Sequence, residues 1–181
     1  MPLLLVALLV GVPVGLLWYW AQERGDNSAL GGSDYVGSPN AAGELADSVG
    51  WPYWWGRGSP STPWEDGPQG VDCSGYACMA LVRLGLLSSS APDMGARTLA
   101  DESYPVEVGD QVPGDLAYYP GHVVVVVSYP GEDGHSAVIG ASGHSTTFGN
   151  VAGECVKVHT TALYRPDFVT YMRLKSAADR A

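Results

Sequence analysis

The chain has 181 residues, of which 24 are glycine, 13 are proline and only 15% are charged. Apart from an apolar N-terminal segment, this length suits one compact domain, and the composition favours a mixed α+β fold over a helical bundle or a disordered chain. The formal net charge of -10, with nine Lys and Arg spread thinly along the chain, leaves no basic stripe for phosphates and excludes nucleic acid as an expected partner.

The first segment is apolar enough to cross a membrane. Residues 2–20 contain no charged side chain, have about the length that spans ~30 Å of hydrocarbon as a helix, and end in an aromatic cluster suited to the interface. No basic residue precedes the run, and bulky aromatics stand where a signal peptide would be cleaved. We therefore expect an uncleaved transmembrane anchor at 1–20 that binds a lipid membrane, rather than a cleaved signal peptide or a buried helix.

The rest of the chain divides into a tether and a domain. Residues 21–39 are polar and rich in Gly and Ser, as in a flexible linker, so the domain is predicted at 40–181. A helix is expected at 41–49, with Asn40 as N-cap. No regular structure is expected in the aromatic loop 50–70, because it is rich in Gly and Pro.

The catalytically suggestive part of the pattern is a helix followed by a series of strands. A helix packed on one face is predicted at 73–87, followed by an irregular stretch. The second predicted strand contains five consecutive valines, which suits burial on both faces. The strands are predicted at 115–119, 122–129, 136–141, 154–159 and 168–175.

Three cysteines are too few for a disulfide framework, and no Cys or His pair has the spacing of a zinc site. No metal or cofactor is therefore expected, and at least one thiol is available for another purpose. Cys78 and Cys155 could be paired in an oxidising compartment, or both could be buried free thiols; the residues alone leave the two alternatives open.

Cys73 is the candidate nucleophile because it lies at the predicted start of a helix. The helix dipole and the unpaired N–H groups of a first turn favour the thiolate and can receive the oxyanion of an acyl-transfer intermediate. Ser74 and Gly75 keep the approach to this thiol uncluttered. His122 opens the valine-rich strand after a Pro-Gly turn, where a rigid backbone would hold an imidazole as the base.

At this point the chain resembles the NlpC-type papain-like peptidases of bacterial cell walls. Three blocks carry the likeness in order, and a fourth near the end is similar to the family's last segment: GWPYWWGRGSP running into GVDCSGYACMALVRLG, then VPGDLAYYPGHVVVVV, then AVIGASG, and finally ALYRP. The resemblance implies a papain-like cysteine peptidase domain at 40–181. Its expected fold is α+β, with the nucleophile-bearing helix packed on a five- to six-stranded antiparallel sheet.

The resemblance also implies roles for single residues. Cys73 is the expected nucleophile, and His122 is the expected general base that later protonates the leaving amine. Tyr53 resembles the family's tyrosine that helps to form the oxyanion site through its hydroxyl, with a packing role as the alternative. Asp72 matches the residue before the nucleophile and is expected to act mainly as a cap or turn former.

The sequence departs from the family at the third catalytic position, which orients the base. The family commonly has a histidine there, whereas this chain has Gly140. His144 lies four residues on and is the predicted replacement; Ser142, a backbone carbonyl or a water are the alternatives. His135, in a turn, is expected to have no catalytic part.

The expected reaction is hydrolysis of an amide bond in a peptidoglycan stem peptide, typically one that follows a D-glutamyl residue. An aromatic-walled groove could be built from Trp51, Trp54, Trp55 and Trp64 and the Tyr118-Tyr119 pair. Arg57 or Arg97 could pair with a stem-peptide carboxylate. The alternative is that the aromatics are core and Arg57 is solvated. The residues predicted to bind substrate are Trp54, Trp55, Arg57, Asp72 and Ser74.

Two other functions are carried as alternatives. The same fold could act as an amidase or an acyltransferase, or the chain could be a membrane-anchored structural component of a virus particle or envelope with a vestigial peptidase fold, as Gly140 would suggest. The orientation of the anchor is poorly determined, because the nearest positive side chain, Arg24, is flanked by Glu23 and Asp26. A single-pass membrane protein of the bacterial cell envelope, or of the membrane of a virus particle, is the expected localisation.

Overall fold

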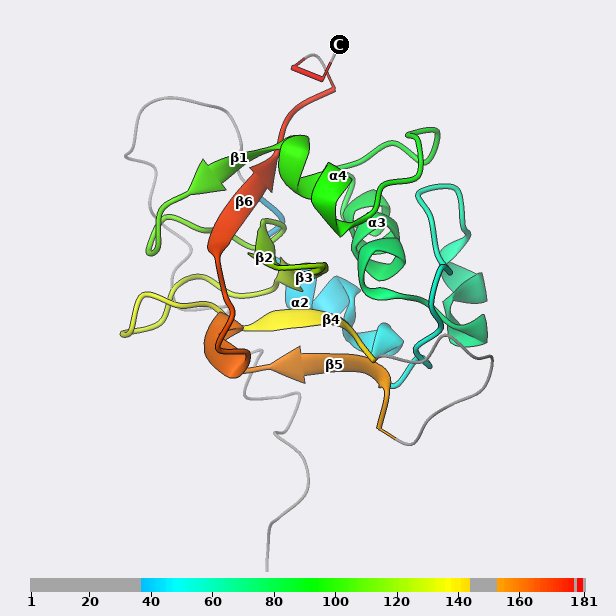
Figure 1. The fold of residues 1–181 in the computed structure, drawn as a ribbon, viewed down its shortest axis with the longest axis horizontal. Coiled ribbons are helices and arrows are strands. Elements are labelled where there is room, and N and C mark those ends of the chain that lie inside the picture. Colours follow the sequence, from blue (N-terminus) through cyan, green and yellow to red (C-terminus); the bar gives the residue numbers. More distant parts are fainter. Residues whose placement is uncertain (1–36, 144–152, 178, 181) are drawn as a thin grey trace, which may run out of the picture.

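The computed structural model describes residues 37–143, 153–177 and 179–180 (Figure 1). The predicted anchor, most of the predicted linker and His144 lie outside the described residues. Within the described part of the chain, no helix combines the length and the apolar character needed to cross a membrane. The elements in chain order are α2 (Ala41–Glu44), η1 (Ala46–Ser48), η2 (Trp64–Gln69), α3 (Cys73–Arg83), α4 (Ala96–Asp101), β1 (Ser103–Val106), β2 (Leu116–Tyr119), β3 (His122–Val126), β4 (Val138–Ser142), β5 (Cys155–His159), η3 (Ala162–Tyr164) and β6 (Thr170–Leu174).

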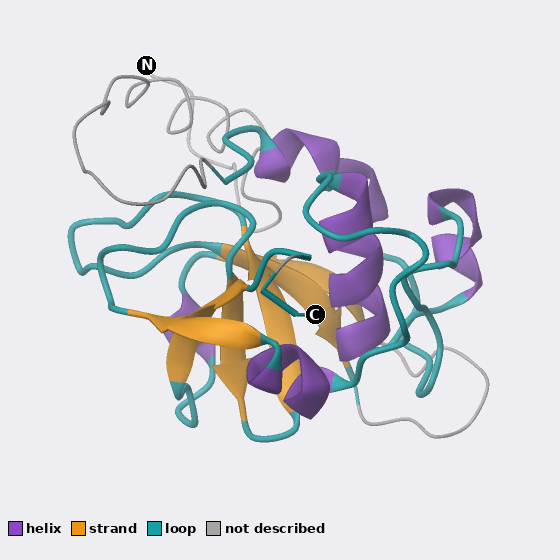
Figure 2. Ribbon diagram, turned by 90° about the horizontal axis from the view of Figure 1, so that it is seen from above, coloured by secondary structure: helices purple, strands orange, loops and turns teal. Residues whose placement is uncertain are grey.

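The strands form one six-stranded sheet in the order β1-β6-β2-β3-β4-β5. Every pair in it is antiparallel, which confirms the predicted sheet. Helix α3 lies against the sheet and contacts β3 and β4 (Figure 2). The nucleophile candidate and the base candidate therefore come from neighbouring elements in two packed layers.

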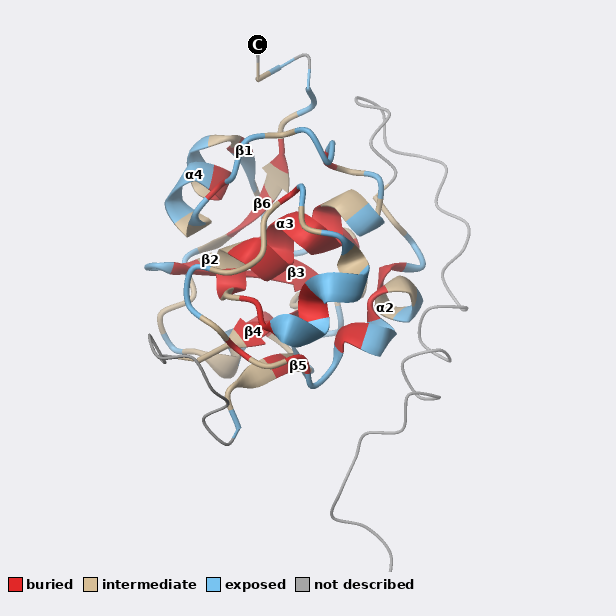
Figure 3. Cartoon of the chain, turned by 90° about the vertical axis from the view of Figure 1, so that its right-hand side faces the viewer, coloured by how far each residue is buried: buried red, intermediate tan, exposed pale blue. Residues whose placement is uncertain are grey.

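Strand β3 is buried along its whole length, as the valine run predicts. Because side chains alternate across a strand, its residues are divided between two clusters. Val123 and Val125 pack in the larger cluster with the buried face of α3. Val124 and Val126 pack in a second cluster, with Tyr119 and Tyr171. Figure 3 shows the buried residues gathered at the centre, in α3 and the strands beneath it. Each buried valine contributes about 1.5–3 kcal/mol, so the start of β3 is held firmly.

Helix α3 ends at Arg83, four residues before the predicted end at 87. Gly85 has a φ of 72°, and its N–H donates to Val82 O at 3.0 Å, while the N–H of Leu86 donates to Leu81 O at 2.8 Å. This pair of bonds is a Schellman ending, in which glycine adopts the left-handed conformation at low cost. The apolar periodicity continued past this stop because Leu86 and Leu87 still pack against the helix side of the core.

Three other predictions of local structure were wrong. The aromatic loop, expected to be irregular, contains the 3-10 helix η2 with Pro68 inside it. The expected helix at 41–49 is split into α2 and η1, and Asn40 makes no side-chain cap hydrogen bond. The stretch expected to be irregular after α3 contains α4 and β1. Strand β1 tolerates Pro105 because it is an edge strand that pairs only with β6.

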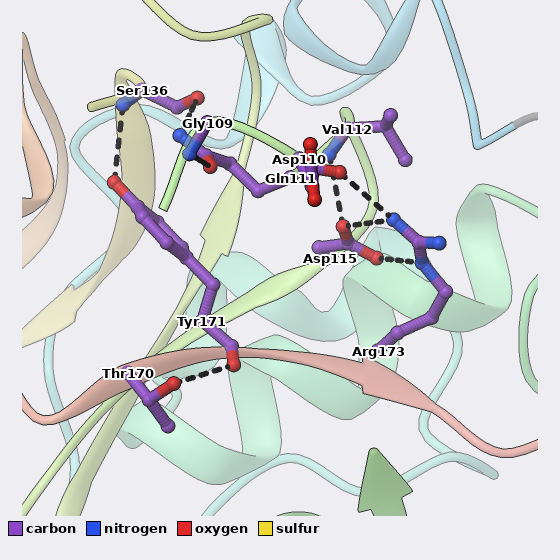
Figure 4. Close-up of polar contacts among 9 residues, drawn as sticks. All are labelled: Gly109, Asp110, Gln111, Val112, Asp115, Ser136, Thr170, Tyr171 and Arg173. Carbon is purple, nitrogen blue, oxygen red and sulfur yellow. Dashed lines mark hydrogen bonds and ion pairs between the residues drawn. The ribbon is translucent and has the colours of Figure 1, made fainter. Parts of the chain in front are cut away.

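A buried ion pair joins β6 to the loop before β2 (Figure 4). The Asp115 carboxylate accepts from Nε and Nη2 of Arg173, both at 2.9 Å, and from the N–H of Val112 at 2.9 Å. The Asp115 side chain is 0% exposed and the Arg173 side chain 25%. The pair fixes the entry to β2, and with it the β2–β3 hairpin that presents His122.

We expect Arg173→Ala to lower the free energy of unfolding by about 3–5 kcal/mol, because it leaves a buried carboxylate without its cation. Urea denaturation followed by tryptophan fluorescence measures the change. Arg97→Ala is the matched control: its ion pair with Asp101 is solvated, with side chains 91% and 71% exposed, and its loss should cost under about 0.5 kcal/mol. Equal losses in the two variants would show that the buried pair contributes nothing beyond an exposed one.

Candidate active site

The N-terminus of α3 is capped by Asp72, as the sequence predicts. Asp72 Oδ1 accepts from the N–H of Gly75 at 2.7 Å and from Ser74 Oγ at 3.0 Å, and Oδ2 accepts from the N–H of Gly56 at 2.8 Å. Both carboxylate oxygens are therefore engaged within the domain. This arrangement favours the capping role of Asp72 over substrate binding, and it engages the Ser74 hydroxyl as well.

The aromatic loop lies directly on the first turn of α3. A Cβ atom at Gly75 would collide with the carbonyl oxygens of Arg57 and Gly58, so only glycine allows this approach. The N–H of Asp72 also donates to Arg57 O at 2.9 Å. The backbone at 56–58 is thereby attached beside Cys73, which places the loop that carries Trp54 and Trp55 next to the helix start.

The environment of Cys73 does not ionise the thiol by itself. Burial, followed by the negative charge of Asp72, raises the pKa of the Cys73 thiol, and the backbone N–H groups of Val123, Ser74 and Cys73 lower it by less. The amides at the helix start lower the pKa of the thiol, as predicted, but burial and the Asp72 charge outweigh them. The physical reason is that the thiol is only 7% exposed, so desolvation outweighs the amides. A neighbouring cation is needed to stabilise the thiolate.

We expect Asp72→Asn to lower the pKa of the Cys73 thiol, because asparagine keeps a cap oxygen and removes the negative charge. The rate of alkylation of Cys73 by iodoacetamide near neutral pH should rise roughly three- to tenfold. Peptide mass spectrometry separates this thiol from the other two. Glu65→Gln, which removes one negative charge from η2, is the control and should leave the rate unchanged. A slower reaction in Asp72→Asn would mean that loss of the cap outweighs loss of the charge.

His122 begins β3 and is 7% exposed. The N–H of the next residue, Val123, lies near enough to the Cys73 sulfur to lower the pKa of the thiol, so the backbone at the start of β3 lies beside the start of α3. His122 Nε2 lies 2.9 Å from the hydroxyl of Tyr164. Tyr164 was assigned no role from the sequence, in which its only signal was its place in the ALYRP block.

Tyr53 lies beside the same thiol. Its ring is 3% exposed, and burial, with the neighbouring Cys73 and Asp72 charges, raises the pKa of the Tyr53 phenol. The hydroxyl therefore stays protonated and able to donate. An isolated parallel β-bridge pairs Tyr53 with Val71, so the segment that carries Tyr53 runs alongside the residues that lead into α3.

The residues predicted to line a groove fall into two groups. Trp51 and Tyr119 are core residues, with Trp51 packed on Trp64 at a centroid distance of 4.6 Å, so the groove prediction is wrong for these two. Trp55 is 60% exposed. The Arg57 guanidinium carbon lies 3.8 Å from the centroid of the half-buried Trp54 ring, and Nη1 donates to Gln69 O at 3.4 Å. Arg57 is therefore held against the aromatic loop rather than fully solvated.

Gly140, which was predicted to occupy the family's third catalytic position, has no room for a side chain unless Val124 moves. A Cβ atom there would collide with the Val124 side chain. His144, the predicted replacement, lies outside the described residues. Ser142, an alternative, has a buried Oγ without a hydrogen-bond partner among the residues that the structure describes. His135 is engaged elsewhere, with Nδ1 3.2 Å from the hydroxyl of Tyr171.

The remaining thiols are not bonded to each other. Cys73, Cys78 and Cys155 are all free, which settles the two alternatives in favour of free thiols. Burial raises the pKa of Cys78 to about 12, and its thiol donates weakly to Met94 O at 3.6 Å. Cys78 is therefore an inert core residue. No group of three or more His, Cys, Asp or Glu suited to a metal ion occurs in the described ranges.

Comparison with known proteins identifies the fold. No family model matches the sequence, and no curated protein matches it. A Staphylococcus aureus structure described as similar to a lipoprotein of the NLP/P60 family aligns with a TM-score of 0.50 and 18% identity, over 82% of this chain and 44% of that chain. The match therefore spans less than half of the staphylococcal protein.

Two further solved structures are similar. The P60 domain of an antigen from M. avium subspecies paratuberculosis aligns with a TM-score of 0.47 and 23% identity, over 75% of this chain and 91% of that one. RipA, a resuscitation promoting factor interacting protein mutated at one histidine, aligns with a TM-score of 0.49 and 19% identity, over 77% and 62%. The match to the staphylococcal structure supports an NlpC/P60-type fold for this chain.

Proposed function

We propose that this domain hydrolyses an amide bond in the stem peptide of peptidoglycan through a thioester on Cys73. The observation that supports it most is the placement of Cys73. Its thiol lies at the capped start of α3, near the N–H of Val123, the residue that follows His122 in β3. A buried thiol whose pKa is raised needs an adjacent base, and His122 is the titratable side chain that the sheet supplies there.

The proposed reaction has two halves. The His122 imidazole takes the thiol proton, the Cys73 sulfur attacks the amide carbonyl, and the imidazolium then protonates the departing amine to leave a thioester. Water, deprotonated by the same imidazole, attacks the thioester and releases the new carboxylate. The Tyr53 hydroxyl and the backbone N–H groups around the sulfur are the donors available to the oxyanion of each tetrahedral intermediate.

Substrate binding is assigned to the aromatic loop. Trp55 is exposed, and Arg57 stacks on Trp54 within the segment attached to the α3 start. An aromatic surface with an adjacent guanidinium suits a short peptide that carries a carboxylate. We further propose that residues 2–20 anchor the domain in the membrane of a bacterial cell envelope or of a virus particle, as their length and apolar character favour.

The test is product analysis by mass spectrometry after the full chain, in detergent, is incubated with purified muropeptides in water enriched in ¹⁸O. Stem-peptide hydrolysis produces a shortened stem with one ¹⁸O atom in the new carboxylate. An amidase would instead release the intact stem from the sugar, and an acyltransferase would give a product without ¹⁸O. Unchanged muropeptides from several bacterial wall types would contradict the proposal and favour the vestigial alternative.

A further inference from the structure

The base candidate is bound to a tyrosine from a distant part of the chain. Tyr164 is the last residue of the short helix η3 and lies 42 residues after His122 in the sequence. Its hydroxyl oxygen is 2.9 Å from His122 Nε2. The hydrogen bond uses Nε2, so a proton exchanged with Cys73 must pass through the other ring nitrogen, Nδ1. In a thiol hydrolase, the group bonded to the far nitrogen sets the orientation and tautomer of the imidazole.

The Tyr164 ring is fixed on two sides. The imidazole of His159, at the end of β5, stacks on it with a centroid distance of 3.7 Å and an interplanar angle of 5°. The ring of Tyr119 meets it edge-on at 5.5 Å. Burial, with Lys157 nearby, lowers the pKa of His159, so the stacked imidazole stays neutral. The hydroxyl is therefore held at one place relative to His122, as a positioning group requires.

The direction of the hydrogen bond decides whether His122 can act as a base. For Nδ1 to take the thiol proton, Nε2 must carry a hydrogen and donate it to the Tyr164 oxygen. The Tyr164 hydroxyl must then give its own hydrogen to another acceptor. Burial raises the pKa of Tyr164, so the group remains a phenol that can accept and donate at the same time.

Ser142 supplies an acceptor in the required place. Its hydroxyl lies close enough to influence Tyr164, although the two do not meet hydrogen-bond geometry in this conformation. Ser142 Oγ is buried and has no partner in the described part of the chain. Such an oxygen is costly to leave unpaired, so a small movement of the Ser142 side chain that pairs it with the Tyr164 hydroxyl is favoured.

We propose that Tyr164 is the residue that positions the His122 imidazole, with Ser142 accepting the phenolic proton, and that the pair replaces the side chain that cannot fit at Gly140. The assignment rests on the proposed function of Cys73 and His122. It is independent of the family's usual third position, because Tyr164 comes from η3 and not from β4.

Among the described residues, the titratable groups near this imidazole include Tyr119 on β2, Tyr164 on η3 and Asp167 just after η3, which is paired with Arg165 at 2.6 Å. Asp167 and Arg165 neutralise each other, and Tyr119 donates its hydroxyl to Ala162 O at 2.6 Å. Removal of the Tyr164 hydroxyl is therefore the change that should act on His122 most directly.

The test compares Tyr164→Phe with Tyr171→Phe. Each variant removes a phenol oxygen that is hydrogen-bonded to a histidine. The partner of Tyr164 is His122, and the partner of Tyr171 is His135. We expect Tyr164→Phe to lower kcat/KM about 10- to 100-fold with KM little changed. We also expect the His122 imidazole, followed by NMR in the full chain, to titrate about one pH unit lower, because the charged imidazolium loses a stronger hydrogen bond to the Tyr164 oxygen than the neutral ring does. Ser142→Ala should shift the titration in the same direction by less, and Tyr171→Phe should leave it unchanged.

The assignment would be overturned if the titration of His122 were the same in Tyr164→Phe as in the parent. If His144→Ala shifted the titration and Tyr164→Phe did not, His144 would be the positioning residue instead. The titration needs no wall substrate, so it separates the two proposals. If the parent cleaves no muropeptide but the titration shifts as expected, the proposed function fails and the Tyr164 assignment stands. If the parent cleaves muropeptide and the titration does not shift, the Tyr164 assignment alone fails.

Discussion

Replacement of Cys73 by alanine should reduce the cleavage of muropeptides by more than about 10⁴-fold, because the thioester forms on the Cys73 sulfur. Loss of a nucleophile that works as a unit with its base removes nearly the whole covalent pathway. The domain should remain folded, since the substitution deletes one sulfur atom and alanine suits the first turn of a helix. Mass spectrometry of products at matched protein concentration measures the loss.

The matched control for this variant is Cys155→Ala. Cys155 is a free, half-buried cysteine at the start of β5. The control should keep the parent rate and the parent unfolding transition. Cleavage by Cys73→Ala at the rate of Cys155→Ala would exclude Cys73 as the nucleophile.

The second large effect is expected for His122→Ala, which should lower kcat by about 10²- to 10⁴-fold near neutral pH. The reason is the direction in which the pKa of the Cys73 thiol is shifted. Burial and the Asp72 charge raise the pKa of Cys73, so without the imidazole the sulfur remains a protonated thiol at neutral pH. The residual rate should therefore rise about tenfold per pH unit through the neutral and mildly alkaline range, as the thiolate fraction grows.

His135→Ala is the matched control for the second prediction. His135 is a half-buried histidine that also bonds a tyrosine hydroxyl, so its loss tests whether any such histidine affects turnover. We expect the control to retain the parent rate and the parent pH profile. A His122→Ala rate within a factor of two or so of the His135→Ala rate would show that His122 is not the base.

The sequence predicted the layers of the fold better than it predicted where each helix and strand begins and ends. The valine run of β3 and the start of α3 at Cys73 were correctly predicted, because burial on both faces and a strong N-cap leave clear signals. The end of α3 was placed too late, since the Schellman turn at Gly85 interrupts an apolar pattern that continues in the packed loop. Strand β1 was missed because it is short and contains Pro105, which only an edge position allows.

The candidate site was predictable where chemistry resides in one residue and not where it depends on packing. Asp72 was correctly predicted as a cap. The state of the Cys73 thiol was not, since burial by the sheet has no signature in DCSG. Tyr164 was missed for a similar reason: its contact with His122 joins η3 to β3 across 42 residues, and no periodicity reports such a contact.

The glycine at the third position shows the same limit. From the sequence, Gly140 suggested either a replacement nearby in the chain, at His144, or loss of activity. In the structure, the Val124 side chain fills the space where a side chain at position 140 would lie, so no catalytic side chain fits there. A polar partner for the base then has to reach it from another element, and Tyr164 does so.

The most direct test of the thiol–imidazole pair is the rate of iodoacetamide alkylation at Cys73 as a function of pH, in the parent and in His122→Ala. If the imidazolium stabilises the thiolate, Cys73 of the parent should react well below pH 7, and His122→Ala should lose this reactivity and show a single rise at alkaline pH. Superimposable profiles in the two proteins would contradict the pairing of Cys73 with His122.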